Sequence, residues 1–269
     1  MSVNVEEICE KLQSQDRRTK IAALDVLNHM CLDAGVSTDA EILQIFDECY
    51  LYLLKCYNDR FESVRERAVD TIDTFMERLQ PNDFHLTNII STLCERMGQQ
   101  ETLESSEEIR LVFMQQLLNL EKRFIKTGNQ ASLQSCYDDI LRIIVKALGD
   151  PYPAVQREAC ACTILLAESA DTYSFRPLVE QLAKALYTLL NHKHSQTRIA
   201  AVKALGFIAL HIDASGDALP RLLMEVSPLL MDSMPLVRRE CGELGVRLLL
   251  ELRDRYSFFE RLIPFVLCW

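Results

Sequence analysis

Apolar side chains recur along this chain at intervals of three and four residues. One clear example is the set Val64, Ala68, Ile72, Phe75 and Leu79. This spacing places the members on one face of an α-helix and leaves the opposite face polar. Comparable stretches, separated by short polar turns, follow one another through the sequence and predict an all-α protein.

The turns themselves repeat. A basic or amide residue opens an amphipathic helix after a tight polar turn at Lys20, Arg65, Arg110, Gln156, Arg198 and Arg238, at spacings of 45, 45, 46, 42 and 40 residues. A fixed period of this length is typical of HEAT and armadillo arrays, in which each repeat contacts only its neighbours. We therefore expect an α-solenoid of HEAT-type helical hairpins, with six repeats and the first helix of a seventh.

The predicted repeats form one elongated domain over residues 1–269. They span residues 1–33, 41–79, 81–126, 133–169, 177–212 and 219–252, followed by a partial repeat at 256–269. Pro177 is expected to start the first helix of repeat five, since proline is tolerated in the first turn of a helix. The last helix is apolar and has no second helix in the sequence to pack against, which favours an amino-terminal portion or a truncated form of a longer array. Trp269 ends the sequence.

In the clearest turns an Asp precedes a Val by five residues, and a small residue follows that Val by four. Such an Asp accepts backbone N–H groups in its own turn or pairs with the basic residue of the neighbouring repeat. The second arrangement predicts a structural ladder along the stack. Its members are Asp59, Arg65, Arg110, Asp150, Arg198, Asp232 and Arg238. Weaker copies of the turn place Glu104 and His192 at the Asp position.

Charge and composition limit the classes of partner and the cellular compartment of the protein. A formal charge of −10 argues against nucleic acid as a partner, because phosphate binding needs clustered Lys and Arg. The longest uncharged stretches are 11 residues, too short to span a bilayer, and no signal peptide opens the chain. Many of the ten cysteines fall at helix-interior positions and suit buried free thiols, and these features together favour a reducing compartment, the cytoplasm or the nucleus. The acidic loop at residues 98–106 is expected to be solvated.

No motif for chemistry stands out. The eight glycines are scattered and form no phosphate-binding loop. Cys160 and Cys162 with His192 and His194 suggest zinc at first sight, yet helical residues two apart point about 200° away from each other. None of the five His precedes a Glu, as the iron ligands of HEAT-like diiron hydroxylases do. We expect no catalytic, cofactor-binding or metal-binding residues, and therefore no enzyme.

One run is far more specific than general repeat patterning. Residues Leu252–Pro264 (LRDRYSFFERLIP) resemble a run in the HEAT-repeat dynein axonemal assembly factor family, the fifth of that named series. The turn Asp150–Glu158 and the helix Ala201–Gly206 are similar to the same family, and the resemblance covers Leu141–Leu267. It implies a cytoplasmic scaffold for preassembly of dynein arms for motile cilia. The implied partners are axonemal dynein heavy and intermediate chains, chaperones and other assembly factors.

A partner surface is expected on the second helices. In repeat two the polar face of the second helix includes four acidic residues: Glu66, Asp70, Asp73 and Glu77. We expect them to meet basic segments of partner proteins at several weak points, which together give avidity without a deep pocket. The alternative is an importin-like transport adaptor that binds basic cargo and a small GTPase. Cargo identity separates the two interpretations.

Overall fold

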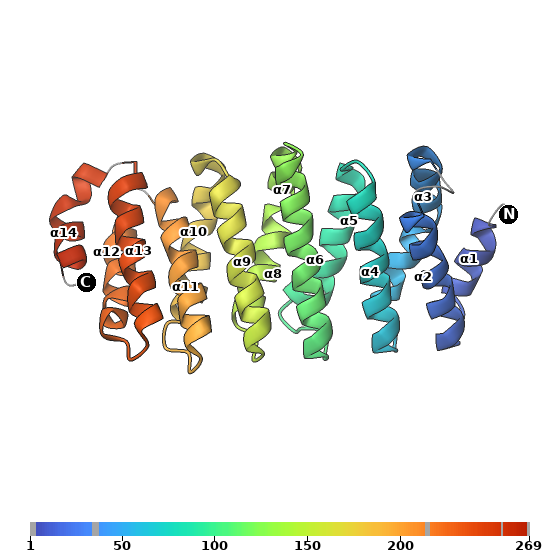
Figure 1. Cartoon of the computed structure of the whole chain (residues 1–269), viewed down its shortest axis with the longest axis horizontal. Coiled ribbons are helices and arrows are strands. Elements are labelled where there is room, and N and C mark those ends of the chain that lie inside the picture. The colour runs from blue at the N-terminus through green and yellow to red at the C-terminus, as the bar shows by residue number, and fades with distance from the viewer. Residues whose placement is uncertain (1–3, 34–37, 213–215, 254, 268–269) are drawn as a thin grey trace.

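The computed structural model describes residues 4–33, 38–212, 216–253 and 255–267, and these residues contain α-helices and short 3₁₀ or π segments without any β-strand. The predicted all-α class is confirmed. Figure 1 shows the helices stacked in chain order along one long axis, with the two termini at opposite ends. No described helix is long and apolar enough to cross a membrane.

Within the residues that the structure describes, six helical hairpins build the stack. Their first helices are α1 (Val5–Leu12), α3 (Asp39–Cys56), α5 (Asp83–Leu93), α8 (Tyr137–Leu148), α10 (Thr172–Tyr187) and α12 (Ala218–Val226). Their second helices are α2 (Arg17–Leu32), α4 (Glu62–Arg78), α6 (Glu107–Lys126), α9 (Pro153–Ser169), α11 (Ser195–Ile208) and α13 (Pro235–Glu251). The remaining elements are η1 (Cys94–Gly98), α7 (Gln130–Ser135), η2 (Ala209–His211), η3 (Ser227–Met231), η4 (Arg255–Phe258) and α14 (Phe259–Leu267).

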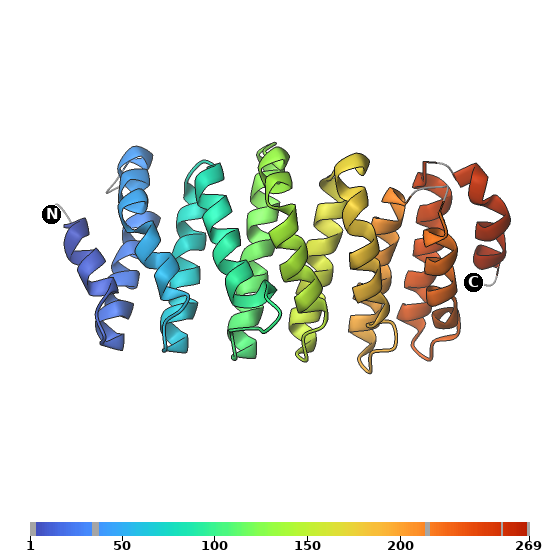
Figure 2. The same cartoon turned by 180° about the vertical axis from the view of Figure 1, so that it is seen from behind.

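The second helices lie side by side and form one broad side of the molecule, which we call the second-helix face. It is in front in Figure 1, and Figure 2 shows the first helices from the opposite side. Each second helix packs against the next, from α2 to α13. The apolar stripes fill the space between the two layers, so that Val64, Ala68, Ile72 and Phe75 are fully buried.

Helix starts follow local capping chemistry. Thr38 and Glu41 form a reciprocal capping box at the start of α3, and the Asp16 and Ser106 side chains each accept a backbone N–H at the starts of α2 and α6. The prediction that Pro177 starts a helix is wrong. Helix α10 begins five residues earlier, because the Asp171 carboxylate accepts the N–H groups of Tyr173 and Ser174, and Pro177 lies inside the helix.

The end of the array also differs from the expectation. Helix α14 packs against α13, where Leu262 is fully buried and Phe265 is 7% exposed. Gly245 of α13 permits this approach, because a Cβ atom there would lie 3.1 Å from a Val266 methyl group. The apolar helix therefore has a partner in α13, although Ile263 and Leu267 remain exposed. Trp269, Asp254 and the Phe258 side chain lie outside the described part of the chain.

Cysteines behave as small apolar residues in this core. The nine described ones, all except Cys268, are buried and free. Burial raises the pKa of the Cys160 thiol to about 12, and it likewise raises the pKa of Cys241 to about 12. Such thiols stay protonated at neutral pH and lack the reactivity of a thiolate.

Candidate partner-binding site

The turns that precede α4, α6, α9, α11 and α13 share one internal hydrogen bond. In these five turns the side chain at the basic or amide position donates to the main-chain carbonyl six residues earlier. Arg65 donates to Asp59 at 2.7 Å, Arg198 to His192 at 2.7 Å and Arg238 to Asp232 at 2.6 Å. The acidic side chain at that earlier position accepts the N–H two residues onward, as Asp59 does from Phe61 at 2.8 Å. Both bonds close the turn before the second helix begins.

Ion pairs then join one repeat to the next. Arg110 of α6 meets Asp150 through two parallel bonds, Nε to Oδ2 at 2.6 Å and Nη2 to Oδ1 at 3.0 Å. Arg198 meets Asp232 in the same way, with both bonds at 2.8 Å. Lys20 pairs with Asp59. The two-pronged pairing fixes orientation as well as distance, so it sets the register of adjacent hairpins.

The expectation of a fully solvated acidic loop at residues 98–106 is wrong at Glu104. This residue is 2% exposed. Its carboxylate accepts from Arg65 at 2.9 Å and from Arg96 at 2.8 Å, and it also accepts the Ser106 N–H at 3.0 Å. Glu104 thus takes the position that Asp holds in the other turns. Glu101 and Glu107, by contrast, are exposed.

We call the contact between the turns of two successive repeats a junction. The junction between α9 and α11 has no charged residues at the positions that form the ion pairs elsewhere. Gln156 of α9 stands where the other repeats carry a cation, and His192 stands where repeats two, three, four and six carry an acid. Gln156 still donates to the Asp150 carbonyl at 2.7 Å, and His192 Nδ1 still accepts the His194 N–H at 3.1 Å. Burial lowers the pKa of His192 and favours its neutral ring. The turn geometry is kept without an ion pair.

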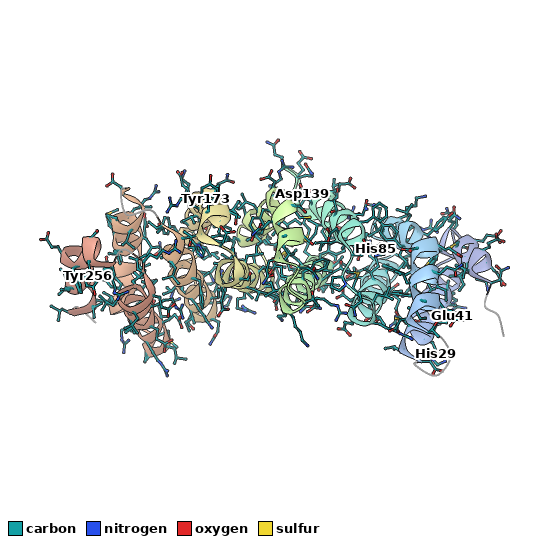
Figure 3. The ribbon with its side chains drawn as sticks, turned by 90° about the horizontal axis from the view of Figure 1, so that it is seen from above. His29, Glu41, His85, Asp139, Tyr173 and Tyr256 are labelled. Carbon is teal, nitrogen blue, oxygen red and sulfur yellow. The ribbon has the colours of Figure 1, made fainter. Side chains whose placement is uncertain are left out.

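The four acidic residues of repeat two lie on α4, along the second-helix face. Glu66, Asp70 and Glu77 are exposed, and Asp73 is half-buried. Asp70 accepts from Asn28 of α2 at 3.1 Å and from Arg67 at 3.1 Å. Figure 3 views the molecule along its edge, with His29 of α2 on this side and Asp139 and Tyr173 of the first helices on the other.

Asp73 is held by amides of the next repeat. Its carboxylate accepts from Gln116 at 2.8 Å and from Asn119 at 3.2 Å, both on α6. The Tyr57 hydroxyl donates to the Gln116 oxygen at 2.7 Å, which orients the amide. Burial raises the pKa of Asp73 to about 6, so its negative charge is complete only above that pH.

A groove with a volume of 510 Å³ runs between α2, α4 and α6. Ile21, Val69 and Val112 are among its apolar lining residues. Its acidic lining residues are Glu66, Asp70 and Asp73, whereas Glu77 lies outside it. We call this feature the acidic groove. Apolar surface beside carboxylates suits a long cationic side chain, because Lys and Arg carry aliphatic stems below a charged head.

Sequence analysis missed residues that line the acidic groove or lie beside it. Asn28, Gln116 and Asn119 orient the carboxylates, and Arg67 contributes a cation. The amides lie 42 to 46 residues from their partners, which is one repeat period. This separation of one repeat was the sequence signal that could have identified the amides as partners of the carboxylates. At the equivalent positions of repeat five stand Ile199, Lys203, Gly206 and Leu210, so the four acidic residues of α4 have no acidic counterparts on α11.

The structure does not assemble a metal site from the residues considered for one. Cys160 and Cys162 are fully buried within α9, whereas His192 and His194 lie in the turn before α11. Within the described ranges no three His, Cys, Asp or Glu side chains gather closely enough to hold a metal ion.

Comparison with known proteins gives a consistent result. Residues 11–268 match the family model described as "Dynein axonemal assembly factor 5-like, TPR repeats". The chain is 51% identical over 267 residues to Dynein axonemal assembly factor 5 of Drosophila melanogaster, covering 99% of this chain and 32% of that protein. It is 34% identical over 220 residues to the Homo sapiens protein of the same name, covering 80% of this chain and 25% of that one.

The fold also matches solved helical-repeat structures. A computationally designed armadillo repeat protein for modular peptide recognition aligns with a TM-score of 0.61 at 18% sequence identity, covering 91% of this chain and 99% of that one. This likeness shows the solenoid fold alone. The chain spans about a third of the length of the Drosophila relative and a quarter of the human one.

Proposed function

Because the chain belongs to the dynein axonemal assembly factor 5 family, we propose that it is a protein-binding scaffold in the cytoplasmic preassembly of axonemal dynein arms. The observation that carries the proposal is the 51% identity over 99% of the chain to a relative of that name. Its partners would be dynein heavy and intermediate chains, chaperones and other assembly factors. The array holds them by surface contact and performs no chemical step.

The acidic groove is the proposed contact for basic segments of those partners. Its lining supplies three carboxylates and one guanidinium, which leaves an excess of negative charge. The neighbouring Glu77 extends this charge along α4. Complementary charge steers a basic segment toward the groove and fixes its register, while further contacts along the array add avidity.

The test is affinity recovery from cytosol of cells building motile cilia, followed by mass spectrometry. The variant Glu66→Lys, Asp70→Lys, Glu77→Lys reverses the exposed charges and leaves the internally bonded Asp73 in place. A matched control, Glu48→Lys, Glu95→Lys, Asp138→Lys, reverses three exposed acids of the first-helix layer. We expect wild type and control to recover dynein chains with chaperones, and the α4 variant to recover several-fold less.

Two other outcomes would count against the proposal. Equal recovery by all three proteins would remove the acidic groove as the contact. Recovery of basic transport cargo with a small GTPase, and without dynein chains, would instead support the importin-like alternative.

A further inference from the structure

A second concave site lies among the turns that lead into the second helices, along the lower edge of the array in Figure 1. It has a volume of 490 Å³, within the range of about 300 to 1,000 Å³ that is usual for ligand pockets. Two neighbouring turns supply its lining, those that open α9 and α11. The lining residues are Tyr152, Pro153, Ala154, Arg157, His194 and Gln196. We call this feature the α9–α11 pocket, and it shares no lining residue with the acidic groove.

The α9–α11 pocket contains a cation whose charge is not neutralised. Arg157 is exposed and forms no ion pair with any residue that the structure describes. Arg239 holds the equivalent position on α13, where it is paired with Glu243 at 2.9 Å. On α4 the equivalent residue is Glu66 of the acidic groove. The charge at this position of the repeat therefore changes sign between the two sites.

No carboxylate is among the described residues that line the pocket. Asp150 belongs to the same turn as Tyr152, but its two oxygens accept from Arg110 and from the Tyr152 N–H. The first turns of α9 and α11 contain no acidic residue, whereas that of α6 contains Glu107 and Glu108. An anion in the pocket would therefore meet Arg157 without a competing carboxylate in the lining.

The turn that opens α11 adds further positive charge. Burial lowers the pKa of His192, and basic neighbours lower it further. These neighbours are His194, Lys193 and Arg198. Arg198 is paired with Asp232, whereas the exposed Lys193 forms no ion pair in the described part of the chain. The surroundings of the pocket thus favour an anionic occupant.

We propose that the α9–α11 pocket binds an acidic segment of a partner protein through one of its carboxylates. The carboxylate pairs with the Arg157 guanidinium, whose planar fork matches two carboxylate oxygens. The Gln196 side-chain amide donates a further hydrogen bond. An apolar side chain beside the carboxylate packs on Tyr152 and Pro153. This contact is separate from the one proposed for the acidic groove and takes a segment of opposite charge.

A carboxylate suits this lining better than a phosphate does. Arg157 is the only Lys or Arg among the described lining residues, and it balances the single charge of a carboxylate. A phosphorylated side chain carries a charge of about −1.5 to −2 and would stay partly unbalanced. Because the whole chain carries a formal charge of −10, general electrostatics opposes the binding of any acidic peptide. Measured affinity would therefore report the local site.

The experiment is a fluorescence-polarisation titration with three labelled peptides. In the first, Asp alternates with Phe; in the second, Gln replaces every Asp; in the third, phosphoserine replaces every Asp. The protein is used as wild type, as Arg157→Glu and as the control Arg239→Glu, which reverses an exposed arginine at the equivalent position of repeat six. Hydrogen exchange of the wild type, with and without the Asp-Phe peptide, locates the contact.

We expect the Asp-Phe peptide to bind the wild type and the Arg239→Glu control alike, and to bind Arg157→Glu about tenfold or more weakly. The Gln-Phe peptide should bind the wild type about tenfold or more weakly than the Asp-Phe peptide, and exchange should slow at the starts of α9 and α11.

Four results would overturn the proposal. The first is no binding of the Asp-Phe peptide up to about 1 mM, and the second is unchanged affinity in Arg157→Glu. The third is equal affinity for the Gln-Phe peptide, or protection confined to other helices. The fourth is tighter binding of the phosphoserine peptide, which would assign the pocket to phosphorylated segments instead. None of these results bears on the acidic groove, which the α4 variant probes separately.

Discussion

Two neighbouring junctions of this array join successive repeats through different residue types, one through an ion pair and the other without charges. Between α6 and α9, Arg110 and Asp150 form a two-pronged ion pair with both residues below 10% exposure. Between α9 and α11, the corresponding residues are Gln156 and His192, which carry no charge in the neutral form. In both turns the bond to the carbonyl six residues earlier is present. The turn bond is therefore common to both junctions, whereas the ion pair between repeats is absent where both charged residues are replaced together.

The largest expected effect comes from removing one charge at the ionic junction. Asp150→Ala leaves the Arg110 guanidinium buried without its carboxylate and also removes the acceptor for the Tyr152 N–H. We expect the free energy of unfolding to fall by about 3 to 5 kcal/mol in chemical denaturation. His192→Ala at the neutral junction removes one acceptor and should cost only about 1 kcal/mol. Equal losses would contradict the contrast between the junctions.

Converting the neutral junction into an ionic one sharpens the comparison. Gln156→Arg alone places a cation at a site that is 7% exposed and lacks a carboxylate, so we expect a loss of about 2 kcal/mol. Adding His192→Asp supplies the missing acid, and the double variant should regain most of that loss. A double-mutant cycle measures the coupling. Additive effects would mean that these two positions do not meet as Arg110 and Asp150 do.

The ionic junction also contains a buried acid, Glu121, whose carboxyl group lies beside the Cys162 thiol of α9. Glu121 of α6 is fully buried, and neither carboxyl oxygen has a nitrogen or oxygen hydrogen-bond partner in the described part of the chain. Burial raises its pKa well above the usual value, so the folded protein keeps the proton. Glu121→Met has a similar volume and no such oxygen. We expect it to raise the free energy of unfolding at pH 7 by about 1 to 2 kcal/mol.

The same residue gives the stability a pH dependence. An unfolded Glu loses its proton near pH 4, while folded Glu121 retains it well above that pH. Over that range the native state binds more protons than the unfolded state, so stability declines as pH rises. The advantage of Glu121→Met should therefore grow between pH 4 and pH 7. Glu121→Gln, which cannot ionise, should share this trend, and a constant difference would show that Glu121 is ionised in the fold.

The smallest effect on stability is expected on the outward face. Glu66→Lys, Asp70→Lys, Glu77→Lys changes exposed positions of α4 and should alter the free energy of unfolding by only about 0.5 kcal/mol per site. Repeat five carries Ile199, Lys203 and Leu210 at the positions that correspond to Glu66, Asp70 and Glu77. Thermal unfolding measures the change. A large loss would mean that these carboxylates serve the fold and would weaken the binding interpretation.

The positions of the turns and of their ladder residues could be predicted because they recur in successive repeats. The period of 40 to 46 residues and the fixed offset from Asp to Val identify the turns. The break at Gln156 was visible for the same reason. Glu104 was harder, since it lies in an acidic loop, and only the structure shows its longer side chain reaching Arg65 and Arg96.

Other features depend on contacts that helical periodicity does not encode. The sequence predicts a helix start at Pro177, yet the Asp171 side chain caps the helix six residues before it. Glu121 looks like any polar residue of α6 until α9 covers it. The acidic residues of α4 were identifiable from the sequence, but the groove between α2, α4 and α6 arises from the packing of three repeats.

The most direct test of the proposed scaffold is site-specific photo-crosslinking in cytosol of cells assembling motile cilia. A photoreactive phenylalanine analogue replaces Glu66 on α4 in one protein and Lys203 on α11 in another, both at exposed outward positions. Mass spectrometry identifies the attached chains. Our account predicts that basic segments of dynein chains are crosslinked from position 66 and not from position 203. Crosslinks of equal yield from both positions, or none to dynein chains from position 66, would contradict it.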